Sequence, residues 1–290
     1  MNALVSNVLT QVFITLIAVS GIYVLTGLTG MFSLGQAAFM AIGSYVSGLL
    51  VIRAHVPFAL AALLAVAGAT LIGYVIGYPV VRLRRDYISL VTLGFGEAIA
   101  ALLNRMTTLT GGASGLTGIP RLVGLPLAFV SAVLAIALAA FFKTSKYGRQ
   151  CIALKGDELA AKAMGINVTR VKMIAFLLSV ALTSYSGVLY AFYMSYVDPT
   201  GFGWKKSADW VIMVFFGGVN SLTGSTLGAF ILPQALRGLQ NYRYVIYAVL
   251  VLLILNFKPS GLLGEWELTP RNLQQAFAKL GKKNTAKKEG

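Results

Sequence analysis

Cysteine and histidine are almost absent from this chain. Its 290 residues include one cysteine, Cys151, and one histidine, His55. A single cysteine cannot form an intramolecular disulfide, and these two residues cannot supply a Cys/His metal cluster. Nucleophilic catalysis by a Ser/His/Asp or Cys/His arrangement is also disfavoured, because the one histidine lies in a predicted loop. We therefore expect no catalytic residues and no bound metal.

Acidic residues are scarce as well, since nine Asp and Glu accompany 24 Lys and Arg, for a net charge of +15. A basic chain attracts polyanions. Here, however, the charges lie in loops and in the tail between apolar runs, as orientation signals do in membrane proteins. We therefore expect no nucleic-acid partner.

A phosphate-binding loop is missing too. Residues 218–226 resemble one faintly, but the lysine that must reach the phosphates is absent. The chain therefore cannot hydrolyse ATP by that route, and we expect it to hold no cofactor. Any ATP would be bound by partner subunits.

Apolar residues are what the chain has in abundance, at 57% of the sequence and a mean hydropathy of +0.78. Several runs reach the roughly 20 residues that a spanning helix needs, and the alternating segments of about 10 residues typical of a β-barrel are absent. The sequence predicts an all-α polytopic membrane protein with a bundle of about nine spans, in a range of eight to ten. Residues 217–224 separate either two spans or one span and a half-helix. The expected spans cover about 8–28, 31–52, 58–81, 87–104, 122–142, 171–197, 209–216, 222–236 and 244–257.

The distribution of Lys and Arg predicts the orientation. Residues 82–86, 143–172 and 258–290 together carry 17 of them, and the rest of the chain carries seven. The richer group belongs in the cytoplasm, which requires an odd number of crossings from an outside N-terminus. We expect residues 1–264 to form the transmembrane domain, with 143–172 as a cytoplasmic loop within it. Residues 265–290 are expected to be a disordered, basic cytoplasmic tail.

The cytoplasmic loop contains a signal for one short helix. Asp157 and Glu158 precede the stretch Leu-Ala-Ala-Lys-Ala-Met, and Gly165 follows as a stop. A helix this short is marginal on its own and usually forms against a partner. We therefore predict a docking element on the cytoplasmic side.

Polar residues inside the apolar runs are candidates for a translocation pathway. Glu97 is the one acid well inside such a run, and an acid at a helix centre costs about 2.5–3.5 kcal/mol on insertion scales. The alternative is that a neighbouring hydroxyl or amide satisfies Glu97, or that it lies near the outer interface. One acid is few for an ion-coupled carrier, which favours a partner ATPase.

Two further groups of polar and small residues are candidates for the pathway. They could offer hydroxyls, an amide or bare backbone to a small polar solute, or they could serve helix packing instead. These candidates are Ser33, Gln36, Thr110, Gly111 and Gly112.

Taken together, the motifs resemble the permease subunits of bacterial branched-chain amino-acid ABC importers, the LivH/LivM permease family, and are LivM-type. The likeness covers about residues 25–264. In chain order it rests on 28–39 (LTGMFSLGQAAF), 84–87 (RRDY), 92–97 (TLGFGE), 110–120 (TGGASGLTGIP), 145–149 (SKYGR), 157–167 (DELAAKAMGIN), 217–224 (GGVNSLTG) and 258–264 (KPSGLLG).

The resemblance implies a type II-like importer membrane domain in the bacterial cytoplasmic (inner) membrane, in contact with membrane lipid. Its partners would be a second homologous permease, two ATPase subunits and an extracytoplasmic solute-binding protein that delivers a small-molecule solute. The docking element then corresponds to the coupling helix on the ATPase. Importer permeases carry an EAA-Gly pattern there.

In this chain Ala160, Ala161 and Gly165 match that pattern, whereas Leu159 occupies the leading position and Glu158 precedes it. The coupling candidates are therefore Asp157, Glu158, Ala160, Ala161 and Gly165.

The resemblance implies that the solute is leucine, isoleucine or valine, and a mostly apolar lining with scattered hydroxyls suits a small zwitterion with an aliphatic tail. The same scaffold could carry urea, short amides or other amino acids. A self-contained channel or ion-coupled carrier is the alternative from a different class. A membrane scaffold without transport is disfavoured by the polar interruptions within the spans.

Overall fold

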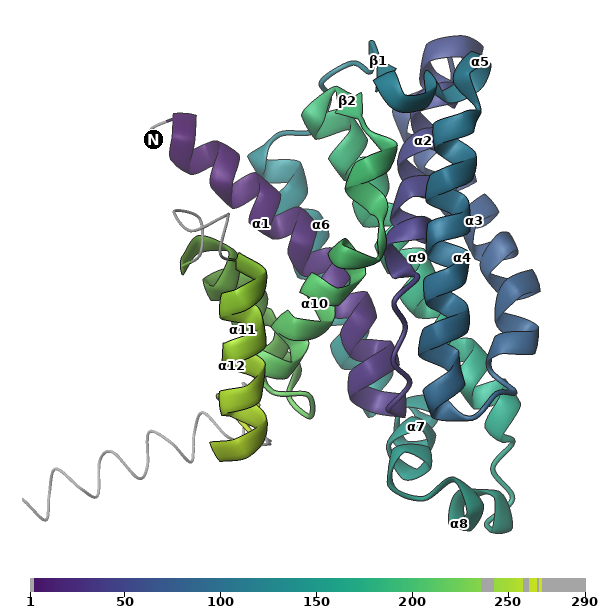
Figure 1. Cartoon of the computed structure of the whole chain (residues 1–290), viewed down its shortest axis with the longest axis vertical. Coiled ribbons are helices and arrows are strands. Elements are labelled where there is room, and N and C mark those ends of the chain that lie inside the picture. The colour runs from purple at the N-terminus through teal and green to yellow at the C-terminus, as the bar shows by residue number, and fades with distance from the viewer. Residues whose placement is uncertain (1–2, 236–242, 258–260, 265, 268–290) are drawn as a thin grey trace, which may run out of the picture.

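The computed structural model describes residues 3–235, 243–257, 261–264 and 266–267, and helices make up most of it (Figure 1). Within these ranges, six helices are long and apolar enough to cross a membrane, which confirms the all-α polytopic fold. They are α1 (Ala3–Ile22) with its π-helical continuation η1 (Tyr23–Leu28), α2 (Gln36–Ala54), α3 (Phe58–Val80), α4 (Arg85–Arg105), α6 (Leu125–Thr144) and α9 (Val168–Met194).

A bent pair of shorter helices follows. α10 (Trp204–Gly217) and α11 (Leu222–Ala235) have 14 residues each, and the chain bends by 120° between them. At 1.5 Å per residue each is roughly 21 Å long, which is short of the hydrocarbon core. If the pair is one broken span, the described residues hold seven spans; the expected count of nine is not confirmed.

The last helix is α12 (Arg243–Phe257), whose apolar stretch is also short. The predicted tail at 265–290 lies outside the described residues except for Trp266 and Glu267.

Short elements occupy the two ends of the bundle. At one end lie α5 (Thr107–Thr110), η2 (Gly112–Ser114) and a two-stranded antiparallel pair of β1 (Leu116–Thr117) and β2 (Tyr196–Val197). After β2 the chain turns through η3 (Pro199–Phe202) into α10. The opposite end carries α7 (Lys146–Gly156) and α8 (Glu158–Ala163), beside the basic loop between α3 and α4 (Figure 1). The two internal loops predicted to be cytoplasmic thus lie at the same end.

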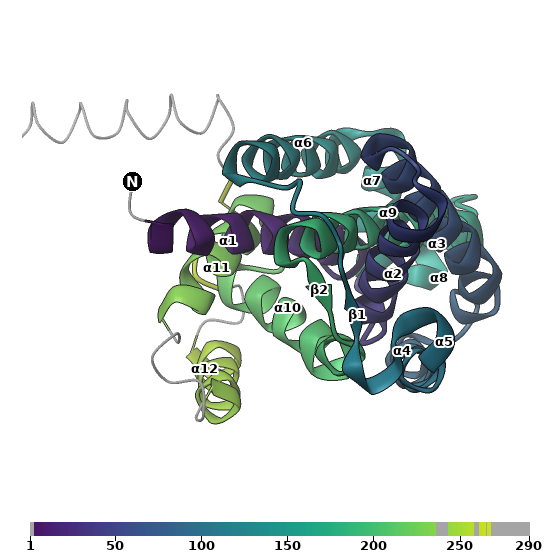
Figure 2. The ribbon, with the colours of Figure 1, turned by 90° about the horizontal axis from the view of Figure 1, so that it is seen from above.

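Helix α9 is the centre of the bundle. It packs against α1, α2 and α3, and seen from above α12 lies at the far edge beside α10 and α11 (Figure 2). In the most apolar stretch of α9, 67% of the residues are buried, against 22–33% in α3, α4 and α6. Most of the large exposed side chains of those three helices are apolar, so these surfaces are suited to lipid or to a partner's helices.

Helices α2 and α9 cross at a pair of glycines. A Cβ atom on Gly187 would lie 2.0 Å from the carbonyl oxygen of Met40, and one on Gly43 would lie 2.2 Å from that of Ser184. The Ser44 hydroxyl donates to the carbonyl of Gly187 over 2.8 Å. Small residues let two membrane helices approach this closely, so the crossing depends on both glycines.

We expect Gly187→Ala to destabilise the protein by about 1–3 kcal/mol, because the added methyl meets backbone that must shift. Gly68→Ala on α3 is the matched control, since nothing lies within 4 Å of its Cβ position. There the higher helix propensity of alanine should leave stability equal or slightly raised. Thermal unfolding of the two variants in detergent gives the comparison; equal unfolding temperatures would contradict the tight crossing.

Candidate functional site

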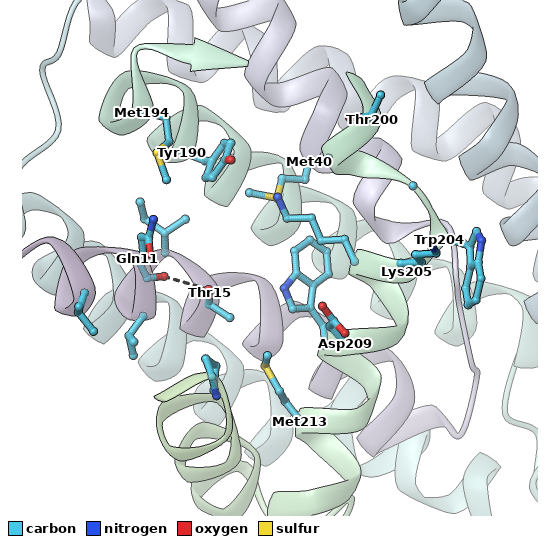
Figure 3. A pocket seen from close by; sticks show the side chains of 18 of the residues that line it. Gln11, Thr15, Met40, Tyr190, Met194, Thr200, Trp204, Lys205, Asp209 and Met213 are labelled. Atoms are coloured by element: carbon cyan, nitrogen blue, oxygen red, sulfur yellow. Dashed lines mark hydrogen bonds between the residues drawn. The ribbon is translucent and has the colours of Figure 1, made fainter. Parts of the chain in front are cut away.

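A cavity of about 760 Å³ opens between α1, α2, α4, α9, η3, α10 and α11. Figure 3 shows Gln11 and Thr15 of α1 across from Asp209 and Met213 of α10, with side chains of α9 beside them. Its walls combine charged, polar and large apolar side chains. Those used below are Met40, Glu97, Tyr190, Lys206, Asp209, Trp210 and Met213.

Glu97 lies at this cavity and caps a helix. Its carboxylate Oε1 accepts a hydrogen bond of 3.0 Å from the backbone N–H of Trp204, the first residue of α10. A helix N-terminus carries partial positive charge, so an anion is stabilised there. Glu97 therefore has an amide partner, as the alternative interpretation required, and it also lines the cavity.

Helix α10 brings three further charged groups to the cavity, Lys205, Lys206 and Asp209. The Lys206 ammonium lies 4.3 Å from the ring centroid of Tyr190 and 4.5 Å from that of Phe202, within cation–π range. Asp209 is 8% exposed, and its charge interacts with that of Lys206.

The sequence prediction did not include Lys206 or Asp209, because it placed Lys206 in a loop and began the helix at Asp209. A base and an acid three residues apart lie on the same face of a helix, and this spacing was the signal that could have identified them.

Two predicted pathway residues are buried in helix contacts and do not line the cavity. Ser33 and Gln36 are 1% and 0% exposed, and Gln36 Oε1 accepts a hydrogen bond from the Thr183 hydroxyl over 3.2 Å. The segment before α2 passes close to α4, where the Leu34 amide donates to the Thr92 hydroxyl. Their burial favours the packing interpretation, and a role in the pathway stays a prediction.

Thr110, Gly111 and Gly112 form a turn at the end of the bundle far from α7 and α8 (Figure 1). The Thr110 hydroxyl donates to the carbonyls of Leu103 and Met106 over 2.6 and 2.8 Å. These three residues do not line the cavity either, and their role in the pathway stays a prediction.

The predicted cytoplasmic helix is present as α8, with the expected start and stop. Asp157 Oδ1 accepts hydrogen bonds from the amides of Leu159 and Ala160 at 2.8 and 3.1 Å, so Asp157 is its N-cap. Gly165 follows the helix with φ of +79°, the left-handed conformation that glycine adopts at little cost. The boundary signals in the sequence therefore identified the element correctly.

Glu158, the second acid among the predicted coupling residues, is fixed to the body of the protein. The Glu158 carboxylate binds the Lys172 ammonium through both oxygens, at 2.9 and 2.8 Å, and the Lys172 side chain is 2% exposed. Ala161 points inward and is 5% exposed. One acid is thus a helix cap and the other anchors α8 to the start of α9.

The outward surface at α8 carries large apolar side chains. Leu159 in α8 and Met164, directly after its last residue, are 80% and 83% exposed, and Ala160, Lys162 and Ala163 between them are exposed as well. Exposed apolar side chains of this size, close together in the chain, indicate a protein contact. Neither Leu159 nor Met164 was among the predicted coupling residues, because those were chosen by their charge and by their match to the EAA-Gly pattern.

Helix α7 holds the one cysteine inside the core. Cys151 is fully buried, and burial raises the pKa of its thiol to about 12. Only the thiolate reacts with maleimides, so at pH 8 we expect labelling to be slowed roughly tenfold or more relative to the denatured chain. Timed labelling with a fluorescent maleimide measures this. Equal rates in the two states would show that α7 is not packed as described.

Within the described ranges, no group of three or more His, Cys, Asp or Glu is placed to hold a metal ion.

Comparisons with known proteins place the chain among transport permeases. The family described as "Branched-chain amino acid transport system / permease component" matches residues 4–255. The LivM permease proteins of the high-affinity branched-chain amino acid transport systems of Salmonella typhimurium and Escherichia coli are 31% and 30% identical. Each alignment covers 89% of this chain and 69% of the relative.

A LivH permease protein of Escherichia coli is 30% identical over 46% of this chain and 44% of its own length. No solved structure matches significantly. The extent of these matches shows that the chain belongs to the family of branched-chain amino acid transport permeases.

Proposed function

We propose that the chain is the membrane-spanning permease subunit of an ABC importer that takes up branched-chain amino acids across the bacterial inner membrane. The family supports the class of protein. The observation that carries the mechanism is α8, a short capped helix anchored to α9 and exposing Leu159 and Met164. It has the form of a rigid contact that receives force from a partner.

The partner at α8 would be an ATPase subunit, one of two in the assembled importer. Asp157 and Glu158 order the helix, and the apolar face makes the contact. When the ATPases close on ATP, α8 would move with them as a lever and switch the spans from inward- to outward-facing. Gly165 and Ala161 serve this role by ending and seating the helix.

A second, homologous permease would complete the membrane domain, and a binding protein would deliver the solute. The chain is similar to both LivM and LivH, which are named as permease proteins of the same kind of system. The exposed apolar faces of α3, α4 and α6 provide surface for this subunit and for lipid. Counting α10, α11 and α12 as separate passes adds three to the six long helices, which keeps nine crossings as our proposal.

The cavity suits the proposed solute. Glu97, Lys206 and Asp209 offer charges of both signs, as a zwitterion requires, and Met40, Trp210 and Met213 offer apolar surface for an aliphatic side chain. A site for urea or a short amide needs no such pair of charges. The charges therefore favour an amino acid over the other solutes of this scaffold.

The test is uptake by the assembled importer. The chain would be reconstituted in liposomes with its partner permease, ATPases and binding protein, and radioactive leucine, urea and acetamide would be compared. We expect uptake of leucine only with internal ATP and all subunits. Uptake by the chain alone, or driven by an ion gradient, would overturn the proposal in favour of a channel or carrier. Preferential uptake of urea or acetamide would overturn the solute.

A further inference from the structure

The turn between α10 and α11 is a meeting point of distant parts of the chain. The carbonyl of Asn220, in this turn, accepts hydrogen bonds from the Lys143 ammonium at 3.0 Å and from the Tyr23 hydroxyl at 3.3 Å. Its side-chain Oδ1 accepts a further bond of 2.6 Å from the Lys155 ammonium. Residues of η1, α6 and α7 thus converge on Asn220.

Lys155 connects this turn to the segment that carries the coupling helix. It lies in the last turn of α7, two residues before the N-cap of α8. Its ammonium also donates to the carbonyl of Gly27 in η1 over 2.9 Å, and its own carbonyl accepts from the Arg85 guanidinium at 3.1 Å. The end of α7 is therefore tied to η1, to α4 and to Asn220.

The turn is held firmly from its other side. The amides of Leu262 and Leu263 donate to the carbonyls of Phe216 and Gly217, at the end of α10, at 3.1 and 3.2 Å. Glu267 pairs with Lys143 and accepts from the Leu222 amide at the start of α11. These contacts satisfy carbonyls at the end of α10 and an amide at the start of α11, so the turn is held to the rest of the chain on this side.

The two helices that leave this turn form one wall of the cavity. α10 contributes Lys206, Asp209, Trp210 and Met213, and α11 contributes Pro233 and Gln234 near its far end. A displacement of Asn220 would therefore tilt α10, and with it the part of the wall that carries Lys206 and Asp209.

We propose that Lys155 is a positioning residue that links the coupling helix to the cavity, by joining the end of α7 to Asn220 at the α10–α11 turn. The inference rests on the proposed function and deepens it. When α8 is displaced by the ATPase, α7 moves with it, and the Lys155–Asn220 bond carries the movement to the hairpin. The GGVNSLTG motif then serves as the receiver of this movement.

The test compares ATP hydrolysis with leucine uptake in the complete importer in liposomes. Lys155→Met removes the ammonium that binds Asn220 and Gly27. Asn220→Ala removes the side-chain acceptor Oδ1 and leaves the backbone carbonyl in place. We expect each variant to keep basal ATP hydrolysis while uptake per ATP falls about tenfold, the scale of an ordinary coupling free energy. Lys155→Arg, which keeps the donors, should recover most of the uptake. Lys146→Met, at the exposed start of the same helix, should match the wild type.

The double variant distinguishes a link from two separate structural roles. If the bond is the link, Lys155→Met and Asn220→Ala together should lose no more uptake per ATP than either alone. Additive losses, or hydrolysis and uptake falling in proportion, would overturn the inference, as would unchanged coupling. Asn220→Asp, which retains an acceptor for Lys155, gives a second reading if Asn220→Ala does not assemble. A wild-type importer that takes up no leucine would instead refute the proposed function.

Discussion

Replacing Leu159 and Met164 together by glutamate is expected to abolish ATP-driven leucine uptake while the chain still folds and inserts. Both side chains are at least 80% exposed in the isolated subunit, so their replacement should change stability by no more than about 0.5 kcal/mol. At an interface, each buried Leu or Met is worth about 1.5–3 kcal/mol. Losing both would weaken the ATPase contact by a factor of roughly one hundred or more.

Co-purification of the ATPase with a tagged permease measures this contact directly. The variant should lose the ATPase, whereas the exchanged pair, Leu159→Met with Met164→Leu, should keep it because the apolar face is preserved. Uptake in the same preparations should follow the amount of bound ATPase. If the glutamate variant retains the ATPase and full uptake, the outward face of α8 is not the docking surface.

The sequence predicted those parts of the fold that depend on local patterns. The long apolar runs became six helices, and the cap residues on either side of α8 placed it correctly. Burial against other helices gave no such signal. Helix α10 begins at Trp204, five residues before the predicted start, because Lys205 and Lys206 interrupt the hydropathy while the helix continues. Its polar first turns face a cavity, which hydropathy cannot detect.

The candidate site was predicted only in part, because the missing information was again how the helices pack. Glu97 stood out because an acid within an apolar run is rare, and it does line the cavity. Ser33 and Gln36 gave a similar signal, yet the tertiary fold buries them. Whether a polar residue in a span faces a cavity or a neighbouring helix depends on packing between segments far apart in the chain. Asp209, buried beside Lys206 at the cavity wall, shows the same limitation.

Glu158→Ala is expected to destabilise the protein, because Glu158 forms a partly buried ion pair with Lys172 beneath α8. Glu158→Ala removes the partner of Lys172, whose side chain is 2% exposed, and leaves an ammonium in the protein interior. Removing one member of a buried pair typically costs about 3–5 kcal/mol. We expect the lower end of that range, because the Glu158 side chain is 40% exposed and water reaches the pair. Arg170→Met, in the exposed first turn of α9, should leave the unfolding temperature unchanged.

A second substitution should reverse most of that loss. In Glu158→Ala with Lys172→Met no charge remains buried, and replacing both members of such a pair by apolar groups is often close to neutral. Thermal unfolding of the two single variants and the double variant in detergent gives the cycle. A double variant as unstable as the sum of the singles would show that the two residues act separately. Recovery of stability without recovery of uptake would show that the pair also holds α8 in the orientation that the ATPase contact requires.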